Sequence, residues 1–158
     1  MKETLKLEDV LPLLSETLER GGSFTFMPHG TSMLPLLREG IDSVRLVSPQ
    51  IRPPKKGDVI LYRRKNGAFV LHRIQRERKN TFVLCGDNQT ALERGVARDS
   101  VIGVADAFYR GGDLVSCDEK SYKKYVKRRI FSRPLRHALA FLKRRLAQIK
   151  KVFGIKKA

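Results

Sequence analysis

Three short polar groupings in the sequence contain residue types that could cleave an acyl bond. The stretch Gly30-Thr31-Ser32-Met33-Leu34-Pro35 offers a serine hydroxyl just after a glycine, which permits close backbone approach. His72 interrupts an otherwise apolar, strand-like run, and Asp87 lies in a Gly-Asp-Asn turn. A serine hydroxyl becomes nucleophilic when a base takes its proton, and a carboxylate can hold that base in its productive tautomer. These residue types fit a serine hydrolase.

Each grouping also has a purely structural explanation. A glycine, threonine and serine in succession are more often only a turn, and a lone histidine in a strand is usually a structural residue. Gly86-Asp87-Asn88 and Gly57-Asp58 likewise fit ordinary turns before or after a strand. The case for chemistry therefore depends on the groupings occurring together.

The two cysteines give no competing site. Cys85 and Cys117 allow at most one internal disulfide, and their spacing does not suggest a metal site. Neither cysteine lies in a turn that begins with glycine and has a candidate base to activate it, so Ser32 is the better candidate nucleophile. We expect two reduced, partly buried thiols, and no metal or cofactor.

Taken in order, the groupings resemble the signal peptidase superfamily, which also includes the self-cleaving repressors of the DNA-damage response. The Ser-Met-x-Pro box that carries the nucleophile in that superfamily corresponds to residues 32–35, and its Gly-Asp box to Gly57-Asp58. The strand with the general base corresponds to His72-Arg73, and the Gly-Asp-Asn box to residues 86–88. The resemblance runs from about Gly30 to about Arg110.

The base divides this superfamily. Common bacterial signal peptidases and the repressors use lysine, whereas the endoplasmic-reticulum and archaeal type uses a His-Arg pair, which His72-Arg73 resembles. The resemblance implies that Asp87 orients or charge-stabilises His72, that Glu93 stands where a second acid lies, and that Thr31 supports an oxyanion hole built on the Ser32 amide. With an ordinary imidazole pKa near ~6.5, activity should fall as His72 protonates below neutrality.

The elements that must position these residues are mostly strands. Leucines at helical spacing up to Leu18 predict a helix within residues 1–22 that begins near Asp9, since Pro12 is tolerated best in a first turn. Asn66-Gly67 predicts a hairpin. Alternating or β-branched runs predict strands at residues 24–27, 43–47, 59–62, 69–74, 81–85, 101–108 and 114–116. We expect a mainly β, signal-peptidase-like domain over residues 23–117.

Basic residues concentrate at the end of the chain. Of 33 lysine and arginine residues, 15 lie from Lys120 onward, where none of the 16 acidic residues occurs. Residues 118–158 therefore form a basic tail with helical character, interrupted near Ser132-Arg133-Pro134 because proline disfavours helix at the preceding residue. Beyond the break, a narrow apolar stripe steps by four and three residues: Leu135, Leu139, Leu142, Leu146, Ile149 and Phe153.

Three explanations of the tail remain open. The stripe could dock on the domain, the tail could bind nucleic acid, or it could lie on an anionic membrane surface, where each basic residue contributes ~1 kcal/mol. Few aromatics and no preceding helix-turn-helix disfavour nucleic acid, and the lack of acids beside the stripe disfavours a coiled coil. We prefer peripheral attachment through residues 120–158.

The sequence contains no secretion signal and no apolar run of the ~20 residues that a membrane-spanning helix needs. We therefore expect a cytoplasmic protein held at the inner membrane surface. The predicted activity is that of a serine endopeptidase with a Ser32-His72 dyad, acting on a peptide, a leader sequence or a preprotein. The alternative is a repressor-like regulatory or binding module that kept this fold and restricted or lost catalysis.

Overall fold

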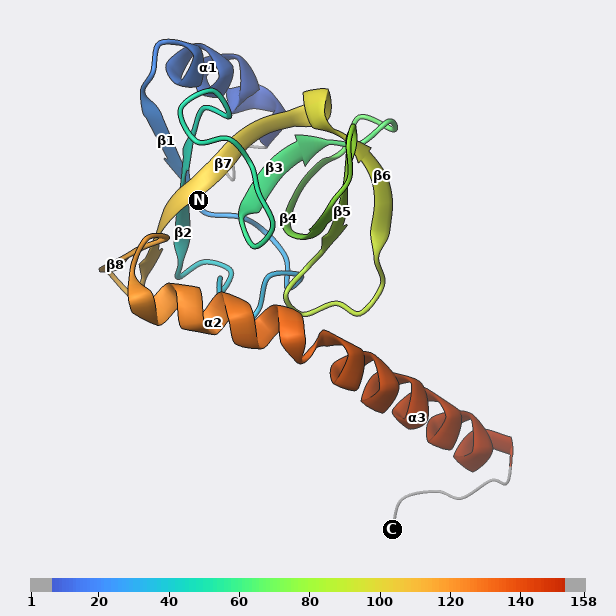
Figure 1. Ribbon diagram of the computed structural model, residues 1–158. Helices are drawn as coiled ribbons and strands as arrows, with labels where there is room; N and C mark the ends of the chain where they lie inside the picture. Colours follow the sequence, from blue (N-terminus) through green and yellow to red (C-terminus); the bar gives the residue numbers. More distant parts are fainter. Residues whose placement is uncertain (1–6, 153–158) are drawn as a thin grey trace.

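A curled antiparallel sheet forms the centre of the protein. The computed structural model describes residues 7–152, with side chains for residues 9–142 and for Arg145. Within this part of the chain the sheet has eight strands in the order β1-β2-β7-β3-β4-β5-β6, and β8 pairs with β7 (Figure 1). The strands are β1 (Ser23–Phe26), β2 (Ser43–Val47), β3 (Val59–Arg63), β4 (Phe69–Glu77), β5 (Thr81–Cys85), β6 (Glu93–Ala97), β7 (Val101–Arg110) and β8 (Asp113–Ser116). The expected mainly β fold is confirmed.

The hydrophobic runs predicted most strands correctly, and β6 is the one they missed. Its sequence, Glu-Arg-Gly-Val-Ala, has one buried residue, Val96, so neither β-propensity nor alternation indicates a strand. The strand β6 forms because its backbone pairs with β5. The Asn66-Gly67 hairpin between β3 and β4 is confirmed, with Gly67 at φ 87°.

Helices cover the two ends of the sheet. The helix α1 (Leu7–Glu19) lies at one end, and α2 (Lys120–Phe131) runs along the other (Figure 1). A short 3-10 turn, η1 (Arg98–Ser100), precedes β7. The helix includes Leu7, two residues before the expected start near Asp9, so the expectation that Pro12 lies in the first turn is wrong, and the proline lies in the helix interior. There the proline removes one backbone donor, while Leu14 and Leu18 anchor the helix in the core.

Two hydrophobic clusters lie on opposite faces of β3 and β4. Val59, Leu61 and Leu71 belong to the cluster that α1 and α2 cover, whereas the alternate residues Ile60 and Ile74 belong to the other. Side chains of successive strand residues point to opposite faces. The neighbours His72 and Arg73, opposite Ile60 and Val59 in the β3–β4 register, therefore serve different faces.

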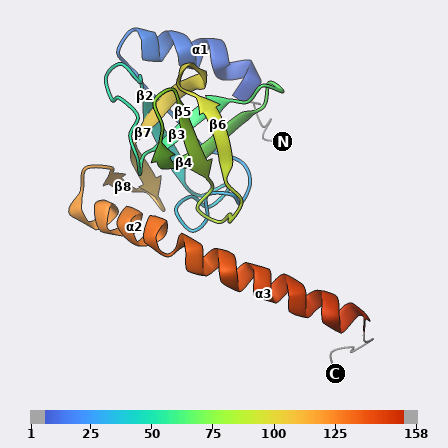
Figure 2. The same cartoon turned by 45° about the vertical axis from the view of Figure 1, so that its right-hand side comes forward.

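The first part of the predicted tail packs on the sheet. In α2, Tyr122 is buried, and its ring centroid lies 5.4 Å from that of Phe108 in β7. The helix α3 (Arg133–Val152) follows after Ser132 and extends away from the sheet in both views (Figures 1 and 2). Of α1, α2 and α3, the helices of the described chain, none combines the length and apolarity needed to cross a bilayer.

Packing of α2 can be tested by Tyr122→Ala. Removing a buried aromatic ring from the core should lower the free energy of unfolding by about 3 kcal/mol. Lys124→Ala, an exposed change on the same helix, should stay within about 0.5 kcal/mol of wild type. Urea denaturation followed by circular dichroism measures both. Equal stability of the two variants would show that α2 is not part of the folded unit.

Candidate active site

Ser32 lies in the loop between β1 and β2. A tight turn follows it, in which the carbonyl oxygen of Met33 accepts hydrogen bonds from the amides of Leu36 (2.9 Å) and Leu37 (3.1 Å). These three side chains are buried in the larger cluster. The turn thus anchors the loop in the core and leaves Ser32 half-buried at the surface of the domain.

Ser32 and His72 border the same pocket, whose volume is about 540 Å³. Its walls are mostly apolar and come from β1, from the Ser32 loop and from the start of β4. Its apolar lining residues include Phe24, Phe26, Met27, Met33, Leu37, Phe69 and Val70. An apolar cavity with a few polar groups is typical of a ligand site.

His72 is buried, with 4% of its surface exposed, and its Nδ1 atom is directed toward two side chains. Nδ1 lies 3.4 Å from the Tyr62 hydroxyl oxygen and 3.9 Å from Glu93 Oε2. Because the Tyr62 hydroxyl donates its proton to Glu93 Oε2 at 2.7 Å, its oxygen can only accept from His72. This arrangement favours the tautomer with the proton on Nδ1, which leaves Nε2 as the basic nitrogen.

Burial lowers the pKa of His72 to about 4, because the charged imidazolium is poorly solvated there. Glu93 opposes this shift and Arg64 adds to it. The expectation that His72 protonates just below neutrality is therefore corrected. In this site the imidazole stays neutral well into the acid range.

Glu93 is the carboxylate that faces His72. Hydrogen bonds from Arg64, the closest at 2.5 Å, together with the bond from Tyr62, lower the pKa of Glu93 and keep it ionised. Glu93 thus holds Tyr62 in position against the imidazole. Only the resemblance to the archaeal type, in which a second acid follows the Gly-Asp-Asn box, points to Glu93, and the sequence gives no signal for Tyr62 or Arg64.

Asp87 faces Arg73 and makes no hydrogen bond to His72 among the described residues. Its carboxylate accepts two hydrogen bonds of 2.7 Å, from Nε and Nη2 of Arg73, and both side chains are fully buried. The expectation that Asp87 orients the imidazole is therefore wrong, although the Asp87 charge does act on the ring and partly offsets the lowering of the His72 pKa by burial. The reason is strand alternation, which directs Arg73, and not His72, toward the face where Asp87 lies.

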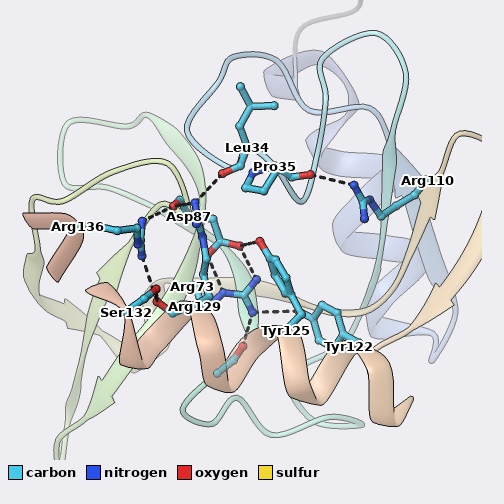
Figure 3. Close-up of polar contacts among 11 residues, drawn as sticks. Leu34, Pro35, Arg73, Asp87, Arg110, Tyr122, Tyr125, Arg129, Ser132 and Arg136 are labelled. Carbon is cyan, nitrogen blue, oxygen red and sulfur yellow. Dashed lines mark hydrogen bonds and ion pairs between the residues drawn. The ribbon is translucent and has the colours of Figure 1, made fainter. Parts of the chain in front are cut away.

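The remaining donors of Arg73 are also satisfied. Its Nη1 atom donates to the Gly57 carbonyl oxygen at 2.7 Å and to the Tyr122 hydroxyl at 3.0 Å, and Tyr125 donates to Asp87 Oδ2 at 2.9 Å. We call Arg73, Asp87, Tyr122 and Tyr125 the Arg73 cluster (Figure 3). It ties the Gly-Asp and Gly-Asp-Asn turns to α2.

The turn at Gly86 supports the backbone of Ser32. The Asn88 amide donates to the Ser32 carbonyl oxygen at 2.8 Å. A Cβ atom at Gly86 would lie 2.6 Å from that same oxygen, so only glycine fits. Since Asp87 sits between these two residues, the Arg73 cluster also determines where the nucleophile loop rests.

Arginines of α2 and α3 bind the same two loops from outside. Arg129 donates to the carbonyl oxygens of Leu34, at 3.2 Å, and of Asp87 (Figure 3). Arg136 donates to the Asp87 carbonyl at 2.8 Å, and Arg133 to that of Thr90 at 2.6 Å. The sequence indicates these arginines only as part of the charge of the basic tail. Their contacts could not be predicted, because any residue type can supply a backbone carbonyl acceptor.

Two features bear on what the site can do. Within the described residues, the Ser32 amide makes no hydrogen bond, so it can donate to an oxyanion, and exposed Thr31 stands beside it. No hydrogen bond joins the Ser32 hydroxyl to the His72 ring in this arrangement, although both groups line one pocket. Such contacts often tighten only when substrate binds.

The cysteines do not compete with Ser32. Cys85 and Cys117 are free and buried, and burial raises the pKa of both thiols, that of Cys117 to about 12. A thiol is a poor nucleophile until it ionises. In the part of the chain that the structure describes, histidine, cysteine and acidic side chains do not gather in the groups of three that could hold a metal ion.

Comparison with known protein families adds one finding. The sequence model of a family described as Peptidase S24-like matches residues 1–106. No match was found among curated proteins or among solved structures. The matched range contains Ser32, His72 and Asp87 and ends within β7, so α2 and α3 lie outside it.

The structural role of Asp87 can be separated from any role in catalysis. Asp87→Ala would leave the buried Arg73 without its ion-pair partner, and should lower the free energy of unfolding by about 3–5 kcal/mol. Asp106→Ala breaks a less buried pair with Arg45 and should change it by no more than about 1 kcal/mol. Chemical denaturation of both variants provides the comparison. Similar losses would contradict the assignment of Asp87 to the Arg73 cluster.

Proposed function

The chain belongs to the Peptidase S24-like family, and on that premise we propose that it is a serine endopeptidase with a Ser32-His72 dyad. The observation that carries the proposal is the shared pocket: a half-buried serine and a buried, neutral imidazole border one apolar cavity. The His72-Arg73 pair further supports placement in the Ser-His branch of signal-peptidase-like enzymes. In that branch histidine, and not lysine, is the general base.

The proposed reaction is acyl transfer. Ser32 Oγ attacks the peptide carbonyl carbon while His72 Nε2 takes its proton, and the imidazolium then returns that proton to the leaving amine. The same nitrogen then deprotonates a water molecule, whose oxygen attacks the acyl carbon, and the imidazolium returns this proton to Ser32 Oγ as the acyl group leaves. The Ser32 amide donates to the oxyanion, with Thr31 as a second donor.

The edges of the sheet indicate how a peptide binds. β1 is an edge strand that pairs only with β2, and residues 69–72 of β4 lie beyond the segment that pairs with β5. Both segments line the pocket. An extended peptide can therefore bind by main-chain hydrogen bonds to these edges while its apolar side chains enter the cavity. We infer a peptide substrate with apolar residues near the scissile bond.

The dyad is tested by Ser32→Ala and His72→Ala. Each variant should lower the rate of peptide cleavage by at least about a hundredfold, since each removes an essential proton-transfer partner. His137→Ala, a change at an exposed histidine of α3 that does not line the pocket, is the matched control and should cleave like wild type. Mass spectrometry of a defined peptide library, and of the protein itself for self-cleavage, measures the outcome.

Two results would contradict the dyad. If wild type and both variants cleave nothing, the chain is the regulatory or binding module and not an enzyme. If His29→Ala abolishes cleavage while His72→Ala retains it, the base is the other histidine that borders the pocket.

The pH profile provides a separate test of His72. Protonation removes the base, so kcat/KM should be lost as the pH falls through about 4, the pKa of the buried ring, and not through ~6.5. The profile should be measured between pH 3 and 8 at constant ionic strength, with circular dichroism to confirm that the protein stays folded. An acid limb near 6.5 would show that the base is solvent-exposed.

A further inference from the structure

The apolar stripe of α3 faces solvent. Leu135, Leu139 and Leu142 have 64%, 51% and 54% of their surfaces exposed. These three residues recur at spacings of four and three, so they share one side of the helix. At these three leucines the stripe is therefore not docked on the domain, contrary to the docked explanation of the tail. Leu146, Ile149 and Phe153, the other members of the predicted stripe, lie outside the described side chains.

The opposite side of α3 holds the helix to the domain. Arg133 donates to the Thr90 carbonyl at 2.6 Å, and with His137, one turn on, it borders a hollow beside β4 and β6. At about 100° per residue, Leu135 lies about 200° around the helix from Arg133. The attachment thus directs the leucines outward, away from the sheet.

The segment that carries the outward stripe is strongly basic. From Lys120 to the end of the chain there are 15 basic residues and no acidic residue. Phe141 is also exposed, and the Arg145 guanidinium lies 5.3 Å from its ring centroid. At about 100° per residue, Arg145 lies about 60° around the helix from Leu142, beside the stripe. An apolar stripe flanked by cations and aromatic rings is the pattern of a helix that lies in a membrane interface.

We propose that α3 is a membrane-surface helix that binds an anionic bilayer through Leu135, Leu139 and Leu142. Acidic headgroups neutralise the flanking cations while the leucines enter the acyl boundary. A second copy of the chain fits less well, because pairing two such stripes brings like charges together without an acid to offset them. Nucleic acid would neutralise the cations but would leave the leucines in water.

If the protein is the peptidase proposed above, membrane binding by α3 also determines where its active site lies. Arg129 near the end of α2 and Arg136 in the first turn of α3 donate hydrogen bonds to carbonyl oxygens of the two loops that form the site. A bilayer that holds α3 would therefore hold the candidate active site close to the lipid surface. Peptides presented at that surface are the substrate class that this geometry favours.

Vesicle co-sedimentation tests the proposal without requiring catalysis. The full chain, and the same chain with Ser32→Ala, should sediment with phosphatidylglycerol-containing vesicles, weakly with pure phosphatidylcholine vesicles, and less as salt is raised. The double variant Leu139→Asp/Leu142→Asp should bind anionic vesicles at least about tenfold more weakly. Both positions are exposed, so circular dichroism should show an unchanged fold.

Leu114→Asp is the matched control, because this leucine in β8 is 51% exposed but lies outside α3. It should bind vesicles like wild type. The proposal is overturned if wild type stays in the supernatant with anionic vesicles, or if the double variant sediments as well as wild type.

Two further results in the absence of vesicle binding would also overturn it. A salt-sensitive shift of duplex DNA that the double variant retains would assign the tail to nucleic acid. A dimer in size-exclusion chromatography that the double variant loses would assign the stripe to a second copy. Cleavage of a soluble peptide by the double variant at the wild-type rate keeps failure of membrane binding distinct from failure of the peptidase.

Discussion

The buried ion pair of Arg73 and Asp87 determines the positions of most groups around the candidate site. Two opposite charges that are fully removed from water stay together only when their geometry is good and their other donors and acceptors are satisfied. Here Gly57, Tyr122 and Tyr125 complete that set. Because the partners come from β4, two turns and α2, satisfying one guanidinium fixes four segments relative to one another.

The nucleophile and the base are held by opposite physical means. Ser32 lies on a loop, and its own carbonyl oxygen accepts a hydrogen bond from the turn that follows β5. The position of Ser32 therefore depends on backbone contacts and on the absence of a side chain at Gly86. His72 is held by strand pairing and by Tyr62. The burial that restricts the ring also lowers its pKa and so keeps it neutral. The rigidity of the imidazole and its neutral state therefore have one cause.

Local patterns predicted much of the fold and the site. Alternation and turn residues indicated seven of the eight strands in the described chain, and the ordered motifs singled out Ser32 and His72. The partner of Asp87 could not be predicted, because it depends on which face of β4 meets the turn. The docking of α2 and the contacts of Arg129 were also missed, since carbonyl acceptors exist at every residue and mark none of them.

His72 and Arg73 occupy consecutive positions in β4, so their side chains point to opposite faces of the sheet and their order in the sequence matters. One residue serves the pocket and the next serves the buried ion pair, so the two cannot be exchanged without presenting a guanidinium to the serine and an imidazole to the carboxylate. Shifting β4 by one residue would have the same effect. The dipeptide thus marks which of the two buried faces of β4 carries the ion pair and which residue reaches the pocket, and an evolving chain could move it along the strand only in steps of two.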